Sequence, residues 1–388
     1  MLTIASLCGM AGLAVDVGSM FHAKRMLQTA ADAAALAGAA DRNYGTTTAS
    51  AKAATAQNGI TDGVNGATVT VNSPPTSGPH AGVATFVEVI VSQSEPTFFM
   101  KLFHLTSMMV SARAVSGVSP TTGCIYTLDP SGIDIGLTGS GDLNMPNCGI
   151  IVDSASSNGI NMTGSSTITA QSIGIVGTYN AGSNTTLVPT PVTGIAPTPD
   201  PLAWETPPSF AASSCLSDPH VTGSTTHTIG PAISGGTVCY NGLSVSGSPT
   251  VVMTPGLYII NGGFSFTGSG TITGSGVTIY LAPPNGSASL TGSGALNISA
   301  PTSGTYNGLL FYQDPNDTNS MKISGSSGSN MRGIFYAPNG SLTVTGSSGA
   351  NIYADFVVSA LSLTGTSNFS SYAGVNGSSP LTSARLVE

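Results

Sequence analysis

Carboxylates are the side chains of this chain that could most readily do chemistry, because paired acids cleave glycosidic bonds by general acid and base catalysis. Four aspartates fall within one stretch of the chain, namely Asp129, Asp134, Asp142 and Asp153. They are spread along that stretch and do not converge on one short motif. The bases Lys322 and Arg332 lie near each other in the sequence, but neither is paired with a nucleophile. The sequence therefore predicts no catalytic residues.

A second group of oxygen ligands occurs in the segment YQDPNDTNS. Side chains of Asp314, Asn316, Asp317 and Asn319 could offer oxygens to calcium, which prefers such ligands. Asp-Pro-Asn-Asp is also ordinary turn chemistry. We expect a turn, keep Asp314 and Asp317 as the calcium candidate, and predict no metal or other cofactor.

The remaining reactive residue types form no recognisable catalytic motif. The histidines are scattered: His22, His80, His104, His220 and His227. There is no Gly-x-Ser-x-Gly elbow, no Walker loop and no dinucleotide fingerprint. We therefore expect a protein that is not an enzyme.

Charge is scarce and unevenly placed. Charged residues make up 7% of the 388 residues, and 50 residues are glycine. From residue 119 onward, three bases stand against eleven acids. Three unclustered bases cannot neutralise a run of phosphates, so nucleic acid is excluded as a partner.

Five cysteines indicate disulfide bonds. Cys8 lies in an apolar run, whereas Cys124 and Cys148 are 24 positions apart, as are Cys215 and Cys239. Four cysteines allow three pairings, and the equal loops favour Cys124 with Cys148 and Cys215 with Cys239. With no Cys-x-x-Cys motif, a zinc site is disfavoured. Disulfides imply an oxidising compartment outside the cytosol.

The elements that must carry these residues begin with a long helix. Residues 1–21 are apolar apart from small polar residues and Asp16, and about 20 such residues suffice to span a bilayer. The helix-favouring sequence continues to about residue 40, which predicts one membrane and stalk helix over 1–40. Asp16 would either contact a partner helix or sit wetted at the membrane interface. Lys24 and Arg25 follow the apolar run, so we expect a charged leader upstream of it.

A small α+β domain is predicted over residues 41–118. Helix-like sequence gives way to alternating apolar and polar residues at 66–73, 84–93 and 108–117, which indicates half-buried strands. The apolar segment 96–105 connects two of them. Its aromatic residues Phe98, Phe99 and Phe103 are expected in the core.

The sequences AGLAVDVGSMFHAKRMLQTAADAAALAGA (11–39) and PTFFMKLFHLTSMMVSARAV (96–115) resemble the TadE/TadG family, which is associated with tight-adherence (Flp) pili of bacteria. Asp16, the Lys24-Arg25 pair and the alanine-rich run carry the resemblance, which covers the first ~118 residues. It implies a pilin-like envelope protein anchored by its N-terminal helix, with the rest exported.

Beyond residue 118 the chain repeats a phrase. YLAPPNGSASLTGSG (280–294) returns as FYAPNGSLTVTGSSG (335–349), and Thr-Gly-Ser marks recur about every 20 to 30 residues. Short apolar strands between the marks predict a right-handed parallel β-helix over 119–375, whose coils stack into one core. A proline-rich insertion at 178–210 would pack through Trp204, and 376–388 would be a tail. The alternative architecture is a β-sandwich.

These features predict a mainly β, non-enzymatic cell-envelope or surface protein associated with Flp pilus assembly or adhesion. We expect it to be anchored in the inner membrane with a periplasmic or extracellular body. Expected partners are the membrane, subunits of the pilus or secretion machinery, and surface glycans. The alternative function is a carbohydrate-binding or carbohydrate-cleaving β-helix, which would require acids from different coils to converge in a groove.

Overall fold

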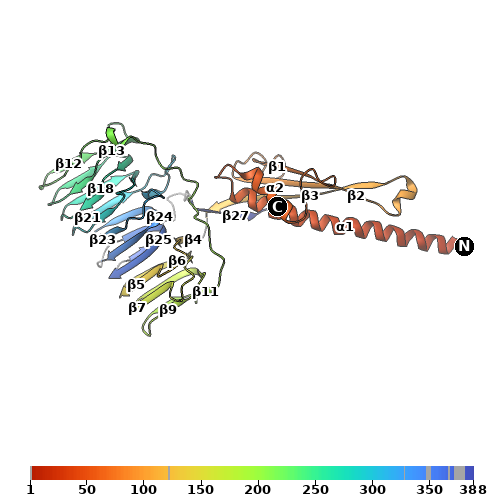
Figure 1. Ribbon diagram of the computed structural model, residues 1–388, viewed down its shortest axis with the longest axis horizontal. Helices are drawn as coiled ribbons and strands as arrows, with labels where there is room; N and C mark the ends of the chain where they lie inside the picture. Colours follow the sequence, from red (N-terminus) through yellow and green to blue (C-terminus); the bar gives the residue numbers. More distant parts are fainter. Residues whose placement is uncertain (1, 121–122, 327, 347–350, 366–367, 371–380) are drawn as a thin grey trace. The chain divides into compact units, whose positions relative to one another are not determined.

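The computed structural model describes the chain except for residues 1, 121–122, 327, 347–350, 366–367 and 371–380 (Figure 1). It divides into two compact units. Unit 1 comprises Met1–Ser119 and Thr382–Glu388, and unit 2 comprises Pro120–Leu381. The expected fold class is confirmed, because a helix and a small sheet are joined to a parallel β-solenoid.

Unit 1 combines two helices with a four-stranded sheet. Helix α1 covers Leu2–Ala40 and α2 covers Thr47–Gln57. The strands are β1 (Thr68–Asn72), β2 (Phe86–Pro96), β3 (Ser107–Pro120) and β27 (Thr382–Leu386), in the order β1-β2-β3-β27. β2 pairs antiparallel with both β1 and β3. The C-terminal residues, expected as a tail, thus supply an edge strand beside β3.

The core of unit 1 is built from small residues. Ala30, Ala31, Ala34 and Ala35 of α1 are fully buried, and they belong to the same apolar cluster as the inward valines of β2. Small side chains let a helix approach a sheet closely. The alternation of Val87, Val89 and Val91 that predicted a half-buried strand is what turns these valines toward α1.

Within the residues that the structure describes, no helix combines the length and apolar character needed to cross a membrane. Part of the expected membrane-spanning segment over 1–21 falls outside that search. The side chains of residues 1–11, Cys8 among them, lie outside the described part of the molecule.

Unit 2 is a parallel β-solenoid. Each strand pairs in parallel with the strand one coil away, as β16 does with β13 on one side and β19 on the other. Its elements in chain order are β4 (Gly123–Thr127), β5 (Ile135–Gly139), β6 (Asp142–Val152), β7 (Ile160–Gly164), β8 (Thr167–Ile175), β9 (Tyr179–Ala181), β10 (Thr186–Val188), β11 (Val192–Thr193), η2 (Ala212–Ser214), β12 (Thr226–Ile229), β13 (Gly236–Tyr240), β14 (Leu243–Val245), β15 (Thr250–Met253), β16 (Gly256–Ile260), β17 (Phe264–Phe266), β18 (Thr271–Ser275), β19 (Val277–Leu281), β20 (Ala288–Leu290), β21 (Ala295–Ser299), β22 (Leu309–Gln313), β23 (Met321–Gly325), β24 (Asn330–Gly346), β25 (Asn351–Gly365) and β26 (Asn368–Ser370).

The repeated phrases occupy equivalent places on different coils. Tyr280 of the first phrase pairs with Tyr312, which pairs with Tyr336 of the second phrase, so one coil lies between them. Glycine at the Thr-Gly-Ser marks is required by close approach. A Cβ on Gly268 would lie 2.1 Å from the carbonyl oxygen of Gly247, and one on Gly292 would lie 2.3 Å from that of Gly268. No other residue fits where these turns stack.

The coils do not stack in chain order. β25 pairs with β24 on one side and with β4 and β5 on the other, so the first strands of unit 2 continue the stack where the last ones end. β10 and β11 pair with β8 at one end, and β12 pairs with β15 at the other (Figure 1). The segment 194–225, here called the strap, connects these two ends.

An apolar core runs through the stack of coils. Inward side chains of successive coils form one continuous cluster, and the rings of Phe311, Phe335 and Phe356 follow one another at centroid distances of 5.0 and 5.5 Å. Both predicted disulfides are confirmed. Cys124–Cys148 and Cys215–Cys239 have Cα atoms 5.6 and 4.6 Å apart, and each joins neighbouring coils.

Candidate functional site: an apolar hairpin tip held by Asp16

The β2–β3 hairpin ends in a loop, residues 97–106, here called the hairpin tip. The hairpin register closes at Pro96 and Ser107, and the Thr97 N–H donates to the Thr106 carbonyl at 3.1 Å. Inside the tip a short 3-10 helix, η1, covers Met100–Phe103. His104, with φ +65°, ends this helix in the left-handed conformation.

Asp16 of α1 fastens the tip. Its carboxylate accepts the backbone N–H groups of Phe98 at 2.7 Å, Phe99 at 2.9 Å and Met100 at 2.8 Å. The residue is 1% exposed. Burial alone would raise the pKa of Asp16, but the three N–H donors, with help from Lys101, outweigh it and lower the pKa. The carboxylate is therefore ionised at neutral pH and caps the start of η1.

The structure thus gives Asp16 partners within its own chain, whereas the sequence suggested a partner helix or water. Gly12 is part of the same contact, because a Cβ there would lie 2.6 Å from the ring of Phe99. Contact between α1 and a separate helix stays a prediction.

The aromatic residues of the tip are exposed, and the expectation that they lie in the core is wrong. Phe98, Phe99 and Phe103 are 59%, 45% and 78% exposed, and Leu102 is 79% exposed. The physical reason is that the tip extends beyond the sheet. There α1 offers Gly12 and Asp16, which hold the backbone of the loop and leave its side chains uncovered.

The part of α1 beside the tip also exposes apolar side chains. Leu13, Val17 and Phe21 recur at a spacing of four and are 51%, 38% and 66% exposed. The next residue at that spacing is Arg25, which is exposed. Its neighbour Lys24 is exposed as well and donates to the Ser111 carbonyl. The apolar face therefore ends at a pair of cations.

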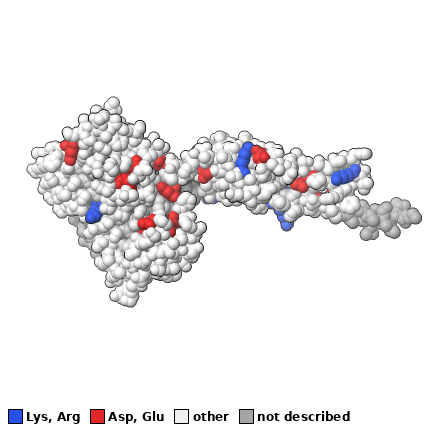
Figure 2. Space-filling view, viewed as in Figure 1, with Lys and Arg blue, Asp and Glu red and all other residues white. Residues whose placement is uncertain are grey.

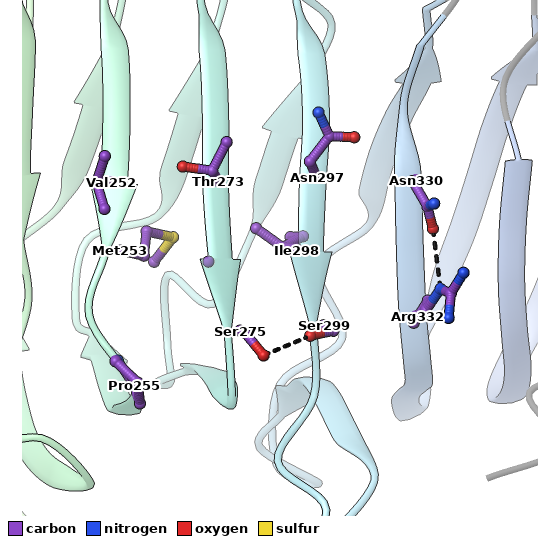
Figure 3. A pocket seen from close by; sticks show the side chains of 11 residues that line it. Val252, Met253, Pro255, Thr273, Ser275, Asn297, Ile298, Ser299, Asn330 and Arg332 are labelled. Atoms are coloured by element: carbon purple, nitrogen blue, oxygen red, sulfur yellow. Dashed lines mark hydrogen bonds between the residues drawn. The ribbon is translucent and has the colours of Figure 1, made fainter. Parts of the chain in front are cut away.

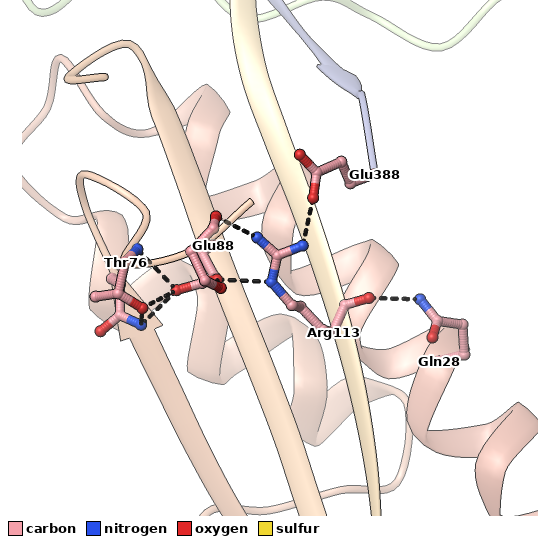
Figure 4. Close-up of polar contacts among 7 residues, drawn as sticks. Gln28, Thr76, Glu88, Arg113 and Glu388 are labelled. Atoms are coloured by element: carbon pink, nitrogen blue, oxygen red, sulfur yellow. Dashed lines mark hydrogen bonds and ion pairs between the residues drawn. The ribbon is translucent and has the colours of Figure 1, made fainter. Parts of the chain in front are cut away.

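A buried carboxylate network that sequence reasoning missed stabilises the same hairpin (Figure 4). Glu88 is fully buried and accepts Arg113 Nε at 2.7 Å, besides donors from Asn72, Thr76 and Ser77. Burial would raise the pKa of Glu88, but these donors lower it to about 2. Arg113 also pairs with Glu388. The sequence did contain a signal for this network, because Glu88 and Arg113 are charged residues of opposite sign inside strands of otherwise alternating apolar and uncharged polar residues.

The aspartates at the start of unit 2 have different surroundings, and Asp129 and Asp153 lie near enough to Asp134 for their charges to act on it. Asp134 is fully buried, and neither carboxylate oxygen has a hydrogen-bond partner. Burial, with the nearby charges of Asp129 and Asp153, raises its pKa to about 8. Asp153 instead accepts the Thr198 N–H of the strap at 3.0 Å, and Asp142 accepts the Thr167 N–H. Burial thus keeps Asp134 mostly in its neutral form at physiological pH.

The calcium candidates take part in turn hydrogen bonds. Asp314 accepts the Asn316 N–H at 2.8 Å and also the hydroxyl of Tyr280, while Asp317 accepts the N–H groups of Asn319 and Gly286. Among the described residues, the one group of three metal-ligating side chains is Cys124, Cys148 and Asp355. Its two sulfurs are joined in a disulfide and are not free to bind a metal.

A shallow groove of about 620 Å³ crosses the coils of unit 2 (Figure 3). Thr273, Asn297 and Asn330 stand in one row on successive strands. Arg332 lies on the same groove, 3.1 Å from the Asn330 Oδ1 atom and 4.9 Å from the ring centroid of Tyr353. Figure 2 shows how sparse charged side chains are on the face that it draws.

Buried acids and tyrosines attach the strap to the solenoid. The hydroxyl of Tyr336 donates to Asp200 at 2.8 Å, and that of Tyr312 donates to the Glu205 carbonyl at 3.1 Å. Glu205 is 5% exposed, and the Oε1 atom of its carboxyl has no hydrogen-bond partner. Burial raises the pKa of Glu205 to about 7 and also raises that of Asp200. Trp204 packs against the apolar cluster that contains Tyr312 and Tyr336, as the sequence predicted.

Comparisons with known proteins bear on unit 1. Residues 1–41 match the family model described as putative Flp pilus-assembly TadE/G-like. This match agrees with the resemblance seen in the sequence and points to an association with the cell envelope. No curated protein and no solved structure matches the chain.

Proposed function

We propose that this protein is a non-enzymatic component of the cell envelope that acts in Flp pilus assembly or adhesion. The TadE/G-like match over residues 1–41 carries the proposal. Unit 1 would be the attachment module, because Asp16, Lys24 and Arg25 lie in or beside the matched helix and its hairpin tip. Unit 2 would be the displayed part, whose work is done by its rigid, weakly charged surface.

The disulfides support a location outside the cytosol. Both pairs join neighbouring coils of unit 2, where oxidation would lock the stack. The acids of unit 2 support a structural role, because Asp153, Asp314 and Asp317 are engaged with backbone N–H groups rather than with one another. We therefore propose a body in the periplasm or outside the cell.

Deletion of the gene in its native bacterium, followed by counting of surface pili and measurement of surface attachment, tests this function. We expect fewer pili or weaker attachment, restored by the wild-type chain, which should be found with the cell envelope and co-purify with pilus-assembly proteins. Asp16→Asn should restore less than Asp32→Asn, a matched change on the same helix. Unchanged piliation and attachment in the deletion strain would refute the proposal.

A carbohydrate-binding role is the second candidate, and the groove on unit 2 favours it. Amide and hydroxyl side chains in register, with Arg332 over the Tyr353 ring, suit the hydroxyl groups and a carboxylate of an acidic sugar. Calorimetric titration with acidic oligosaccharides tests it. Arg332→Gln should abolish binding, whereas Lys322→Gln, a basic residue on β23 that does not line the groove, should not. Equal effects of the two changes would exclude this groove.

A further inference from the structure

We propose that the hairpin tip and the adjoining exposed face of α1 form a lipid-binding surface that inserts into the boundary layer of a bilayer with anionic headgroups. The proposal concerns unit 1 alone. It uses no part of the pilus assignment, and its test can fail or succeed independently of it.

The first support is the concentration of exposed apolar side chains. Phe98, Leu102 and Phe103 project from the tip with 59%, 79% and 78% of their surface exposed, and Leu105 follows with 52%. Contiguous exposed apolar patches of this kind mark interaction surfaces, because water does not favour them. Phe21 and its neighbours on α1 extend the patch along the helix.

The second support is the sign of the surrounding charge. Lys101 lies within η1, and Lys24 and Arg25 stand where the apolar face of α1 ends. Asp16 is buried under the tip, and Glu95, half-buried at the base of the hairpin, is the other acid nearby. Basic side chains beside an apolar surface attract anionic headgroups and can lay their stems along it.

Charge and composition favour a lipid surface over a protein partner. Aromatic residues are common in both kinds of interface, but lysine is depleted from protein interfaces and enriched on helices that lie at membrane surfaces. The tip carries Lys101 between half-buried Met100 and exposed Leu102, where a protein partner would have to desolvate the ammonium. A headgroup phosphate lies in the hydrated layer of a bilayer, so it can pair with the ammonium while much of the surrounding water remains.

The third support is that the tip is already ordered before it meets a partner. Three N–H bonds to Asp16 fix its backbone, and Phe99 rests on Gly12. Insertion would therefore not have to offset the entropy of ordering a loop. The exposed rings are held outward on a rigid support.

Co-sedimentation of the purified chain with phosphatidylglycerol vesicles, and with phosphatidylcholine vesicles in parallel, tests the proposal. We expect preferential binding to the anionic vesicles, weakened by salt. Leu102→Ser with Phe103→Ser should weaken binding by about tenfold for each residue, since each loses the burial of a large apolar side chain. Ile233→Ser with Leu216→Ser, which removes two exposed side chains from unit 2, is the matched control and should bind as the wild type does.

A fluorescent reporter gives an independent reading that needs no destabilising change. Trp204 is the only tryptophan and lies on the strap, so Phe103→Trp adds one probe in the tip. Brominated acyl chains should quench the new tryptophan and leave the wild-type emission unchanged. The proposal is overturned if the tip tryptophan is not quenched, if neutral and anionic vesicles bind equally, or if the serine variant binds as well as the control. Loss of self-association without vesicle binding would assign the surface to a second copy instead.

Discussion

The buried carboxyl of Glu205 makes attachment of the strap depend on pH. Its pKa in the folded chain is about 7, against an ordinary value of 4.5, because burial disfavours the ionised form. The folded state thus holds a proton that the unfolded chain releases. The contribution of Glu205 to stability is therefore greatest below about pH 4.5, falls as the pH rises toward 7, and then levels off. The gap of about 2.5 pH units corresponds to a loss of about 3 kcal/mol.

Glu205→Met tests this reasoning, because methionine has a similar length and no group that must be desolvated. We expect the variant to be more stable than the wild type by about 3 kcal/mol near pH 8 and by much less near pH 4.5. Urea unfolding followed by the fluorescence of Trp204, the neighbouring residue, measures the difference directly. Asp200 also titrates beneath the strap, so the comparison between variant and wild type isolates Glu205.

Glu95→Met, on β2 of unit 1, is the control and should leave the Trp204 transition unchanged. A stabilisation of equal size at both pH values would show that packing, and not ionisation, explains the effect. A variant less stable than the wild type near pH 8 would refute the assignment of a neutral, buried Glu205.

Two further predictions concern unit 1. Glu88→Gln should lower the free energy of unfolding of unit 1 by about 3 kcal/mol at neutral pH. The donors around Glu88, which lower its pKa to about 2, stabilise only the ionised carboxylate. The advantage of the wild type should therefore disappear as the pH falls from 4.5 toward 2. The helical circular-dichroism signal measures it, with Glu95→Gln as control; a pH-independent loss would contradict the linkage. Asp16→Asn should speed amide hydrogen exchange at residues 98–100 in the tip, while Asp32→Asn should not, and unchanged protection would show that the carboxylate does not hold the tip.

The sequence predicted the stacked turns and the disulfides correctly, because glycine and cysteine each have a specific structural role at these positions. The glycines of several Thr-Gly-Ser marks, Gly164, Gly268 and Gly292 among them, are needed because the stacked turns leave no room for a Cβ. The cysteine spacing gave both disulfides for a related reason, since one coil separates the partners in each pair. In a stack of similar coils, a residue that one coil requires recurs in the sequence at about the length of a coil.

The order of the coils could not be read in that way. Parallel pairing of β25 with β4 depends on which strand edge is free at the end of the stack, and every strand of the solenoid has a similar alternating pattern. The proline-rich segment was expected to be an insertion at 178–210. Its first part instead forms β9, β10 and β11, and the strap begins only at residue 194.

The candidate site was half predictable. For Asp16 the sequence left two alternatives, contact with a partner helix or a wetted position at the membrane interface. Its partner is instead a loop more than 80 residues away, and no local pattern encodes that contact. Phe98 and Phe103 were assigned to the core on composition alone. Composition cannot distinguish a buried apolar connector from an exposed one, because the difference lies in what the rest of the fold places beside it.

The two termini of unit 2 give a reason why unit 1 should fold without it. The chain leaves unit 1 at the end of β3 and returns as β27, the neighbour of β3 in the same sheet. The Val115 N–H donates to the Glu388 carbonyl at 2.9 Å, and the Ser116 hydroxyl donates to the Arg385 carbonyl at 2.8 Å, so the returning strand is held by unit 1 itself. Unit 2 is thus an insertion between adjacent strands.

Replacing residues 121–381 with a short Asn-Gly turn should therefore leave a folded unit 1, since a short loop costs little closure entropy when its ends are neighbours. The expected result is an unchanged helical signal and the same acid sensitivity as Glu88 confers on the full chain. A second version that also lacks 382–388 is the control. It removes Glu388 from Arg113 and the bonds from β27 to β3, and should be less stable. If both versions were equally stable, β27 would contribute nothing to the sheet, and the insertion would have no structural reason to return to its starting strand.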